Sequence, residues 1–241
     1  MRTLIIILLL VLVLAGAVYV NGQAANWHYV ASGQPAELLY AAAFDGFQDE
    51  WETYNERRVA EITDGVLRLS NSQSNNGSYS VTKTRFADFD LTVEARAVAG
   101  PADNGYGVIF RVQDRQNYYT FMVSSDGYYQ VQRVVNGDLK ELSVWIESPL
   151  VNAGLEAVNR LRVIARGNQF EFYLNGERAQ VCIPNNPDAQ SMYMMETCID
   201  GQMLDVLTDN SIAQGQVGMV IQTFEESGVS AEFDNLVIFG A

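Results

Sequence analysis

Alternation of apolar and polar residues between Asn104 and Asn136 is the feature that most constrains the fold of this chain. Residues 106–113, 118–124 and 128–132 each carry apolar side chains at every second position. Because successive side chains of a β-strand point to opposite faces of a sheet, this period indicates half-buried strands. The turn residues Asp126-Gly127 suit the positive φ angles of a tight hairpin. The segment is therefore predicted to be an antiparallel meander with one apolar face and one polar, aromatic-rich face.

Similar signals continue along most of the chain. Hairpin turns are indicated at Asp64-Gly65, Gly167-Asn168 and Asn175-Gly176, and almost no helical period accompanies them. A length of 241 residues suits one large all-β domain. We therefore expect an antiparallel β-sandwich over residues 39–241, with its first and last strands side by side.

The charge balance excludes one class of partner. The chain has a net charge of -14 and a pI near 4.4. A surface that binds nucleic acid needs clustered Lys and Arg to neutralise phosphates, so no nucleic-acid partner is expected. The same balance disfavours attraction to anionic membrane surfaces, and its simplest consequence is solubility outside the cell.

The N-terminus carries an uninterrupted apolar run over residues 4–20. As a helix this run would span roughly 26 Å, slightly less than the hydrocarbon core of a bilayer. Residues 1–22 are either a signal peptide cleaved near Ala15-Gly16-Ala17 or an uncleaved signal anchor. Val18-Tyr19-Val20 prolong the run past the cleavage site and favour the anchor. The rest of the chain, with residues 23–38 as a linker, is then extracytoplasmic, either membrane-anchored through the N-terminal helix or secreted.

Cys182 and Cys198 are the only two cysteines. In an oxidising compartment they are expected to pair, and closing so short a loop contributes about 3 kcal/mol in the chain-entropy model. A zinc site would need more ligands than these two and the single histidine, His28, provide. The pair is predicted to clamp a surface insertion over residues 183–214, with a short helix near residues 201–207.

Several short motifs of this chain belong together as a set. They include Phe44-Asp45-Gly46-Phe47, Asp64-Gly65-Val66-Leu67, Gly107-Val108-Ile109-Phe110-Arg111, Asn117-Tyr118-Tyr119, Tyr173-Leu174-Asn175-Gly176 and Glu232-Phe233-Asp234-Asn235-Leu236. In these motifs and in their order the chain resembles the concanavalin A-like lectin/glucanase superfamily, which includes laminin-G-like and 3-keto-disaccharide hydrolase-like domains. The resemblance covers about residues 39–239 and implies a jelly-roll sandwich, in a superfamily that mixes lectins, adhesive modules and glycosidases.

No catalytic constellation is predicted. Glucanases of this superfamily carry Glu-x-Asp-x-x-Glu on one strand, and Glu232-Phe233-Asp234 lacks the third carboxylate. Serine-type catalysis would need a base near the nucleophile, and the single His28 lies in the linker. No cofactor is expected, although Asp45 and Asp234, in terminal strands that would adjoin, are candidates for a structural calcium site. The alternative for both residues is turn capping.

The polar face of the meander remains as a candidate binding surface. Gly107, Ile109, Arg111 and Gln113 are assigned to that face. Sugars dock on aromatic rings flanked by planar polar groups, which this face offers. Two alternatives stay open: the tyrosines simply cover the sheet, and Arg111 pairs with Glu94 on a neighbouring strand. The candidate ligand-binding residues are Arg111, Tyr118, Tyr128, Gln130 and Trp145.

The function expected from these observations is binding of carbohydrate or another cell-surface ligand by an exported, non-catalytic domain. Two alternatives are a glycoside-acting hydrolase of the keto-disaccharide hydrolase-like type and a structural subunit of an envelope assembly. The latter would use the insertion at residues 183–214 as its contact surface.

Overall fold

The computed structural model describes residues 29–45 and 50–241. The described residues form strands, turns and loops without an α-helix. Within this part of the chain, no helix has the length and apolar character needed to cross a membrane. The apolar run at residues 4–20, and with it the predicted N-terminal helix, lies outside the described residues.

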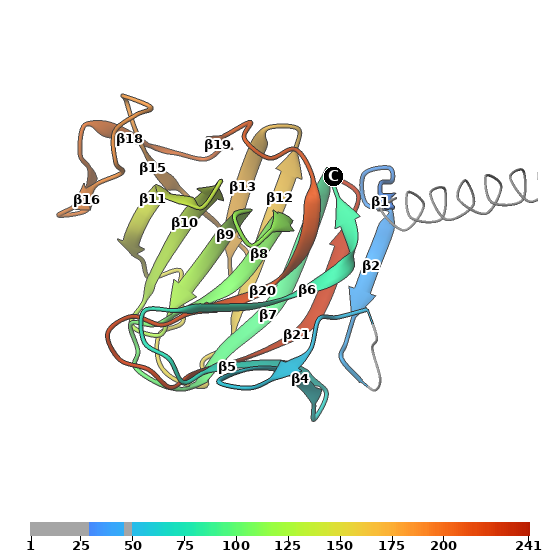
Figure 1. Cartoon of the computed structure of the whole chain (residues 1–241). Coiled ribbons are helices and arrows are strands. Elements are labelled where there is room, and N and C mark those ends of the chain that lie inside the picture. The colour runs from blue at the N-terminus through green and yellow to red at the C-terminus, as the bar shows by residue number, and fades with distance from the viewer. Residues whose placement is uncertain (1–28, 46–49) are drawn as a thin grey trace, which may run out of the picture.

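A seven-stranded sheet contains the meander (Figure 1). The three strands at residues 105–114, 117–124 and 128–135 are consecutive neighbours and pair antiparallel, as the alternation predicted, and a fourth strand at residues 138–147 continues the meander. The strands in spatial order are β1 (Val30–Ala31), β6 (Gly77–Phe86), β20 (Gly215–Gln222), β8 (Gly105–Asp114), β9 (Asn117–Ser124), β10 (Tyr128–Val135) and β11 (Asp138–Glu147).

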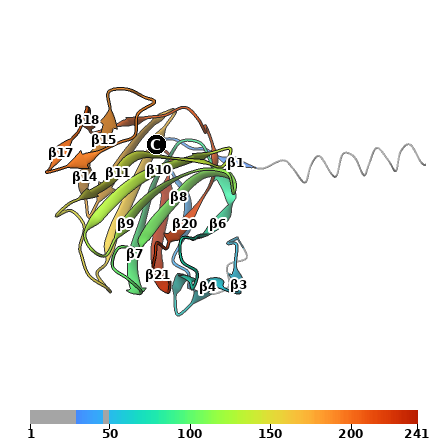
Figure 2. The ribbon, with the colours of Figure 1, turned by 60° about the vertical axis from the view of Figure 1, so that its left-hand side comes forward.

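A ten-stranded sheet forms the second layer (Figure 2). β2 and β5 both pair with β21, at different stretches of that strand, so the first and last long strands lie side by side as expected. The main path runs β14 (Glu177–Ala179), β13 (Gln169–Leu174), β12 (Asn159–Arg166), β7 (Phe89–Ala99), β21 (Val229–Phe239), β5 (Val66–Asn71), β4 (Arg58–Thr63) and β3 (Tyr54–Asn55), with β2 (Leu38–Ala42) on β21 and β19 (Leu207–Thr208) on β13.

The core lies between the two sheets and is rich in aromatic rings. Phe110 stacks on Tyr119 with ring centroids 5.3 Å apart, and Phe170 and Phe172 of β13 reach them from the opposite sheet. These rings are fully or almost fully buried. Since each ring buries a large apolar surface, the cluster contributes to the packing that holds the two sheets together. The all-β jelly-roll sandwich predicted for this part of the chain is therefore present.

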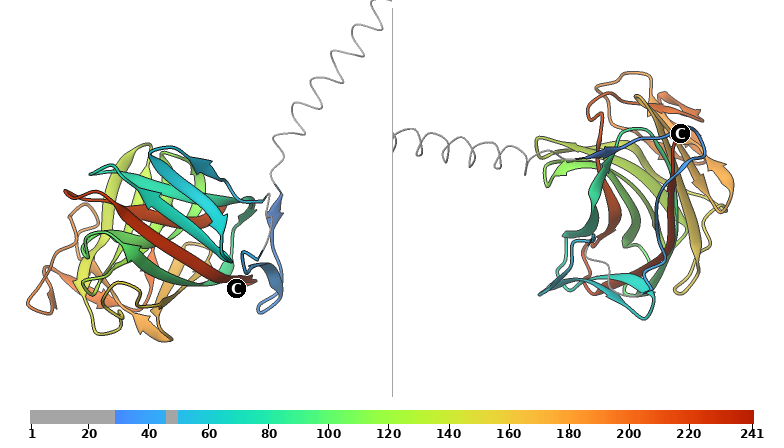
Figure 3. Two further views of the ribbon diagram at one scale, coloured as in Figure 1. Left: turned by 90° about the horizontal axis from the view of Figure 1, so that it is seen from below. Right: turned by 90° about the vertical axis from the view of Figure 1, so that its right-hand side faces the viewer.

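The described part of the segment assigned to a linker is tied to the domain. β1 pairs in parallel with β6, and Ala31 is buried in the core. Farther on, the amide of Ala36 donates to the carbonyl of Gly240, next to the C-terminus (Figure 3). The paired segments are too short to leave a periodic signal in the sequence, so the pattern of residues 23–38 indicates only a linker.

The disulfide between Cys182 and Cys198 is present and joins two small hairpins at one end of the sandwich. The hairpins are formed by β15 (Val181–Pro184) with β18 (Gly201–Leu204) and by β16 (Tyr193–Met194) with β17 (Thr197–Cys198). The helix expected near residues 201–207 is wrong. Pairing of β18 with β15 satisfies the backbone there and packs Met203 against the core, so tertiary contacts override a weak local preference.

Candidate functional site

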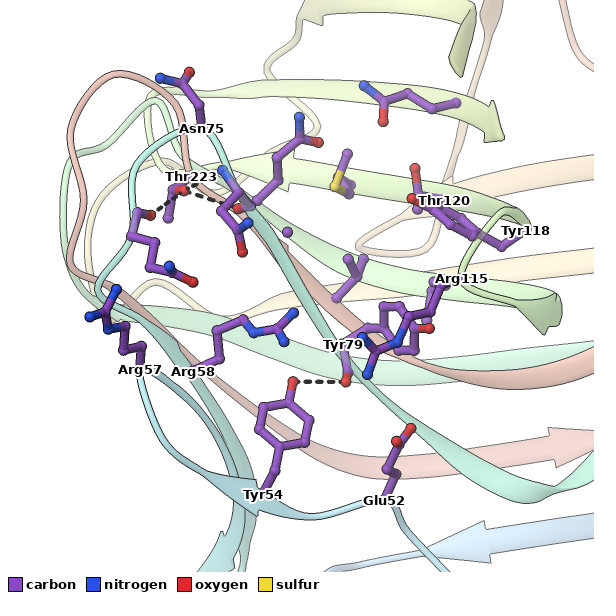
Figure 4. Close-up of a pocket in the computed structure, with 18 of the residues that line it drawn as sticks. Glu52, Tyr54, Arg57, Arg58, Asn75, Tyr79, Arg115, Tyr118, Thr120 and Thr223 are labelled. Carbon is purple, nitrogen blue, oxygen red and sulfur yellow. Dashed lines mark hydrogen bonds between the residues drawn. The ribbon is translucent and has the colours of Figure 1, made fainter. Parts of the chain in front are cut away.

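A cavity of about 930 Å³ lies on the face of the seven-stranded sheet that points away from the sandwich core (Figure 4). Its floor is formed by β6, β8, β9, β10 and β20. Its wall is formed by the β3–β4 hairpin with residues 52–53 before it, and by the loop at residues 73–76. The sandwich core fills the space between the sheets, so this cavity is a separate, solvent-accessible feature.

The floor is apolar and carries two aromatic rings. Ile109, Met122 and Val220 form a small buried cluster beneath the cavity. Tyr79 and Tyr118 pack on that cluster, with ring centroids 6.3 Å apart and planes tilted by 52°. Half-buried rings of this kind offer flat apolar surface together with a polar hydroxyl.

Two polar side chains, Thr120 and Gln132, lie beside the apolar residues of the cavity floor. Thr120 is 2% exposed, and its hydroxyl has no hydrogen-bond partner among the described residues. The amide of Gln132 is oriented by a relay in which its Nε2 donates to Gln130 Oε1 at 2.7 Å. Gln130 in turn donates to Glu141 Oε1 at 2.6 Å. Because its amide nitrogen is engaged in this way, Gln132 is held in one orientation at the cavity floor.

Charged groups stand at the rim. Arg57, Arg58 and Arg115 line the cavity together with Glu52 and Glu56. The turn that carries Arg115 is fixed by Asp114, whose Oδ1 accepts the amide of Gln116 at 2.7 Å. This backbone hydrogen bond is the main reason why the pKa of Asp114 lies below its usual range.

The tyrosines of the cavity are neutral at physiological pH. Burial raises the pKa of Tyr54, Tyr79 and Tyr118 above the usual phenol value, and for Tyr79 the nearby guanidinium of Arg115 opposes this only in part. Neutral phenols donate and accept hydrogen bonds but do not act as bases. The site is therefore equipped for hydrogen bonding and stacking.

Among the predicted ligand-binding residues, Tyr118 lines the cavity. Gln130 is fully buried beneath it and orients Gln132. Trp145 packs on the floor cluster and edge-on against Phe224, a cavity residue, where Gly105 leaves room for its indole. Tyr128 shares the face of Gln130 by strand alternation, but it lies at the start of β10, opposite Glu147 and away from the cavity lining.

Arg111 does not lie on this face, and its assignment there is wrong. A β-bulge follows Phe110, and Arg111 adopts φ 51°, which turns its side chain into the core. Its guanidinium donates to the carbonyls of Ala87, Gly167 and Ile212 and lies 4.7 Å from the centre of the Phe170 ring. Its ion-pair partner is Asp88, at 3.7 Å; no ion pair joins it to Glu94.

The remaining carboxylates considered for chemistry lie elsewhere. Glu232 is on the face of the ten-stranded sheet away from the core, where Arg68 Nη2 and Arg96 Nη2 donate to it at 2.7 and 2.6 Å. Asp234 accepts the amide of Asn235 at a bulge of β21, and Asp45 lies at the Gly65 turn. Among the described residues no group of three or more His, Cys, Asp or Glu could hold a metal ion.

Sequence reasoning missed most of the rim and part of the floor. Arg57 and Arg58 lie in a hairpin that is far in sequence from the meander. The alternation of Tyr79 with Val81 is the one sequence signal that could place Tyr79 on a sheet face. Which strands adjoin the meander is decided by topology, which the sequence pattern does not specify.

The fold is shared with carbohydrate-related proteins at low sequence identity. A carbohydrate-binding module, CBM66 from Bacillus subtilis, is 17% identical with a TM-score of 0.55, covering 78% of this chain and 94% of that module. A Bacillus subtilis protein of unknown function with a galectin-like fold is 12% identical with a TM-score of 0.57, covering 85% and 96%. A xylan β-1,4-xylosidase from Bacillus halodurans is 14% identical with a TM-score of 0.55, covering 86% of this chain but only 39% of the enzyme.

These likenesses establish the fold. No curated protein matches the sequence. A family model, by contrast, matches residues 40–235, which is more than half of the chain and includes most of both sheets, and this match confirms the resemblance drawn from the sequence motifs. The chain therefore belongs to the family of the 3-keto-alpha-glucoside-1,2-lyase-like domain.

Proposed function

We propose that this protein is an exported carbohydrate-binding domain that holds a saccharide in the cavity of its seven-stranded sheet without catalysing its cleavage. The observation that carries the proposal is the hydroxyl of Thr120, which is buried at the cavity floor without a protein partner. Burying a hydroxyl without a hydrogen bond costs about 1–3 kcal/mol. A ligand hydroxyl that reaches it, once the side chains that cover it shift, would recover that cost.

The surroundings of Thr120 suit a sugar. Its strand neighbour Tyr118 and the adjacent Tyr79 offer ring surface on which the C–H face of a pyranose can stack. Gln132 offers an oriented amide on the neighbouring strand, since it pairs with Thr120 across β9 and β10. A volume of about 930 Å³ is within the range of ligand pockets and has room for more than one sugar ring.

A glycan array followed by calorimetric titration of the best ligand tests this function. The full-length protein in detergent micelles is expected to bind, and Tyr118→Ala and Thr120→Val to weaken binding by about tenfold or more each, as loss of one stacked ring or one hydrogen bond does. Tyr173→Ala, on the opposite sheet, is the matched control and should bind as the wild type does. Absence of binding to every glycan would exclude the carbohydrate function.

Export and anchoring form part of this proposal. The apolar run at residues 4–20 and the disulfide between Cys182 and Cys198 both suit a domain held outside the cytoplasm. Protease added to intact cells or spheroplasts should digest the domain. In untreated cells the protein should sediment with the membranes. A soluble protein in the culture fluid whose mass is reduced by loss of the N-terminal segment, or protection from protease, would contradict the anchored arrangement.

A second candidate function is favoured by the family description, which names a lyase. Glu52, at the cavity rim beside Tyr79, would then serve as the general base. Incubation with a 3-keto-α-glucoside, followed by chromatography of the products, distinguishes the two functions. Turnover that Glu52→Gln abolishes would establish the enzyme, whereas binding without turnover is the result expected for the non-catalytic domain.

A further inference from the structure

The arginines of the cavity differ from most others in the part of the chain that the structure describes, because they form no ion pair with a described carboxylate. Among the described residues seven arginines form ion pairs with Asp or Glu, for example Arg68 and Arg96 with Glu232. Arg57, Arg58 and Arg115 form none with a described carboxylate. In a chain with 29 acidic residues, three arginines without a described ion-pair partner line one cavity, and the two carboxylates beside them, Glu52 and Glu56, leave an excess of positive charge there.

The backbones that carry these arginines are fixed. The carbonyl of Arg57 accepts both the amide and the hydroxyl of Ser72. Arg58 begins β4 and pairs with Asn71 of β5. The β8–β9 turn of Arg115 is held by Asp114 and is joined to the β10–β11 turn, since the amide of Gly137 donates to the carbonyl of Gln116 at 3.1 Å.

The guanidinium groups converge on the aromatic floor. In Figure 4 Arg58 and Arg115 extend toward Tyr79 from opposite sides of the cavity, whereas Arg57 lies farther out beside Arg58. Glu52 and Glu56 also line the cavity, but neither is within 4.0 Å of a described guanidinium nitrogen, as an ion pair requires. Two planar cations therefore face the place where a sugar ring would stack.

We propose that the cavity selects saccharides that carry an anionic group, a carboxylate or a sulfate ester, bound by Arg58 and Arg115 while the ring rests on Tyr79 and Tyr118. This inference rests on the proposed carbohydrate function and adds the class of sugar. Guanidinium groups match carboxylate and sulfate oxygens in paired, charge-assisted hydrogen bonds. Partial exclusion of water by the floor strengthens that attraction relative to an open surface.

Calorimetric titration of the full-length protein in detergent micelles with matched oligosaccharides tests this proposal. The probes are an oligogalacturonate, the same oligomer with its carboxylates reduced to alcohols, and a sulfated galactan oligomer. At least one acidic oligomer is expected to bind at least tenfold more tightly than the neutral one. Its affinity should fall with added NaCl, because salt screens exposed charges, and the neutral oligomer should respond little.

The variant Arg58→Gln/Arg115→Gln should lose at least tenfold in affinity for that acidic oligomer and keep its affinity for the neutral one. Arg160→Gln, an exposed arginine of the opposite sheet that also forms no ion pair with a described residue, is the matched control. Equal affinity for acidic and neutral oligomers, unaltered by the double substitution, would overturn the selectivity and leave the carbohydrate function standing. Failure of all three probes and of a wider glycan array would overturn both.

Discussion

The phenol of Tyr54 donates a hydrogen bond to the backbone carbonyl of Tyr79 over 2.8 Å. Tyr54 belongs to β3, at the end of the ten-stranded sheet, and Tyr79 belongs to β6 of the seven-stranded sheet. The bond therefore joins the wall of the cavity to its floor at the ring on which we expect a sugar to stack. Burial of the Tyr54 side chain raises the pKa of its phenol, so the phenol keeps its proton at physiological pH.

Tyr54→Phe removes this bond without changing the packing of the ring. We expect a loss of about 1 kcal/mol in the free energy of unfolding, the usual net value of one hydrogen bond, together with weaker ligand binding. Urea unfolding followed by tryptophan fluorescence measures the loss. Tyr118→Phe is the matched control, because the hydroxyl of Tyr118 bonds to no described residue, and the two variants should differ by about that amount. Equal stability would contradict the structural role of the bond.

Thr120→Val is expected to stabilise the free protein while weakening its ligand binding. The substitution replaces an unpartnered buried hydroxyl by a methyl group of similar size, which should raise the free energy of unfolding by about 1 kcal/mol. The matched control is Thr82→Val, because Thr82 is also buried but donates to the carbonyl of Thr84. That variant should be destabilised by about 1 kcal/mol. Thermal melting should give a higher melting temperature for Thr120→Val and a lower one for Thr82→Val than for the wild type. A lower melting temperature for Thr120→Val would show that the Thr120 hydroxyl has a structural partner.

Arg111→Leu should destabilise the fold severely. The fully buried guanidinium donates to three backbone carbonyls and packs on Phe170, so its removal leaves those acceptors without these donors. Urea unfolding is expected to show that the free energy of unfolding falls by about 3–5 kcal/mol, as it does when a buried polar network is broken. Arg115→Leu, a few residues along the same hairpin but exposed, should stay within about 0.5 kcal/mol of the wild type. A loss for Arg111→Leu below about 1 kcal/mol would contradict this role.

Arg111 also shows where sequence reasoning about the fold stops. The alternation in residues 106–110 is followed faithfully, and Tyr106, Val108 and Phe110 all enter the core. The bulge after Phe110 then reverses the two faces, so that Arg111 turns inward and Val112 joins the small outer cluster. A bulge of this kind leaves no mark in a period-two pattern, because it depends on three carbonyls contributed by distant loops.

The cavity was predictable only in part, for a related reason. Strand alternation places Tyr118 on the polar face of the meander, and this residue does line the cavity. Thr120 sits on the same face but offers no sequence signal, since its lack of a partner is a property of packing. Arg58 reaches the site through the β3–β4 hairpin, whose position depends on long-range contacts such as that of Tyr54 with Tyr79.

The pH dependence of stability should reveal the carboxylate of Glu232. Burial raises its pKa, but hydrogen bonds from the Arg68 and Arg96 guanidinium groups lower it more, so the pKa lies below the usual value of 4.5. A group whose pKa is depressed on folding stabilises the folded state above its unfolded pKa, and this contribution is lost as the pH falls through the folded pKa. At pH 7, Glu232→Gln should therefore lower the free energy of unfolding by about 2 kcal/mol, the contribution of hydrogen bonds to a charged group.

The difference between wild type and Glu232→Gln should shrink as the pH falls below 4.5, because the wild-type carboxyl then takes up a proton and becomes as neutral as the amide. Urea unfolding at pH 7, 4.5 and 3 measures this convergence. Glu226→Gln, in an exposed loop, is the matched control and should follow the wild type at each pH. Parallel stability curves for wild type and Glu232→Gln would mean that the two guanidinium groups do not hold the carboxylate ionised. Convergence, by contrast, would identify Glu232 as a structural ion-pair centre of the ten-stranded sheet, separate from the cavity.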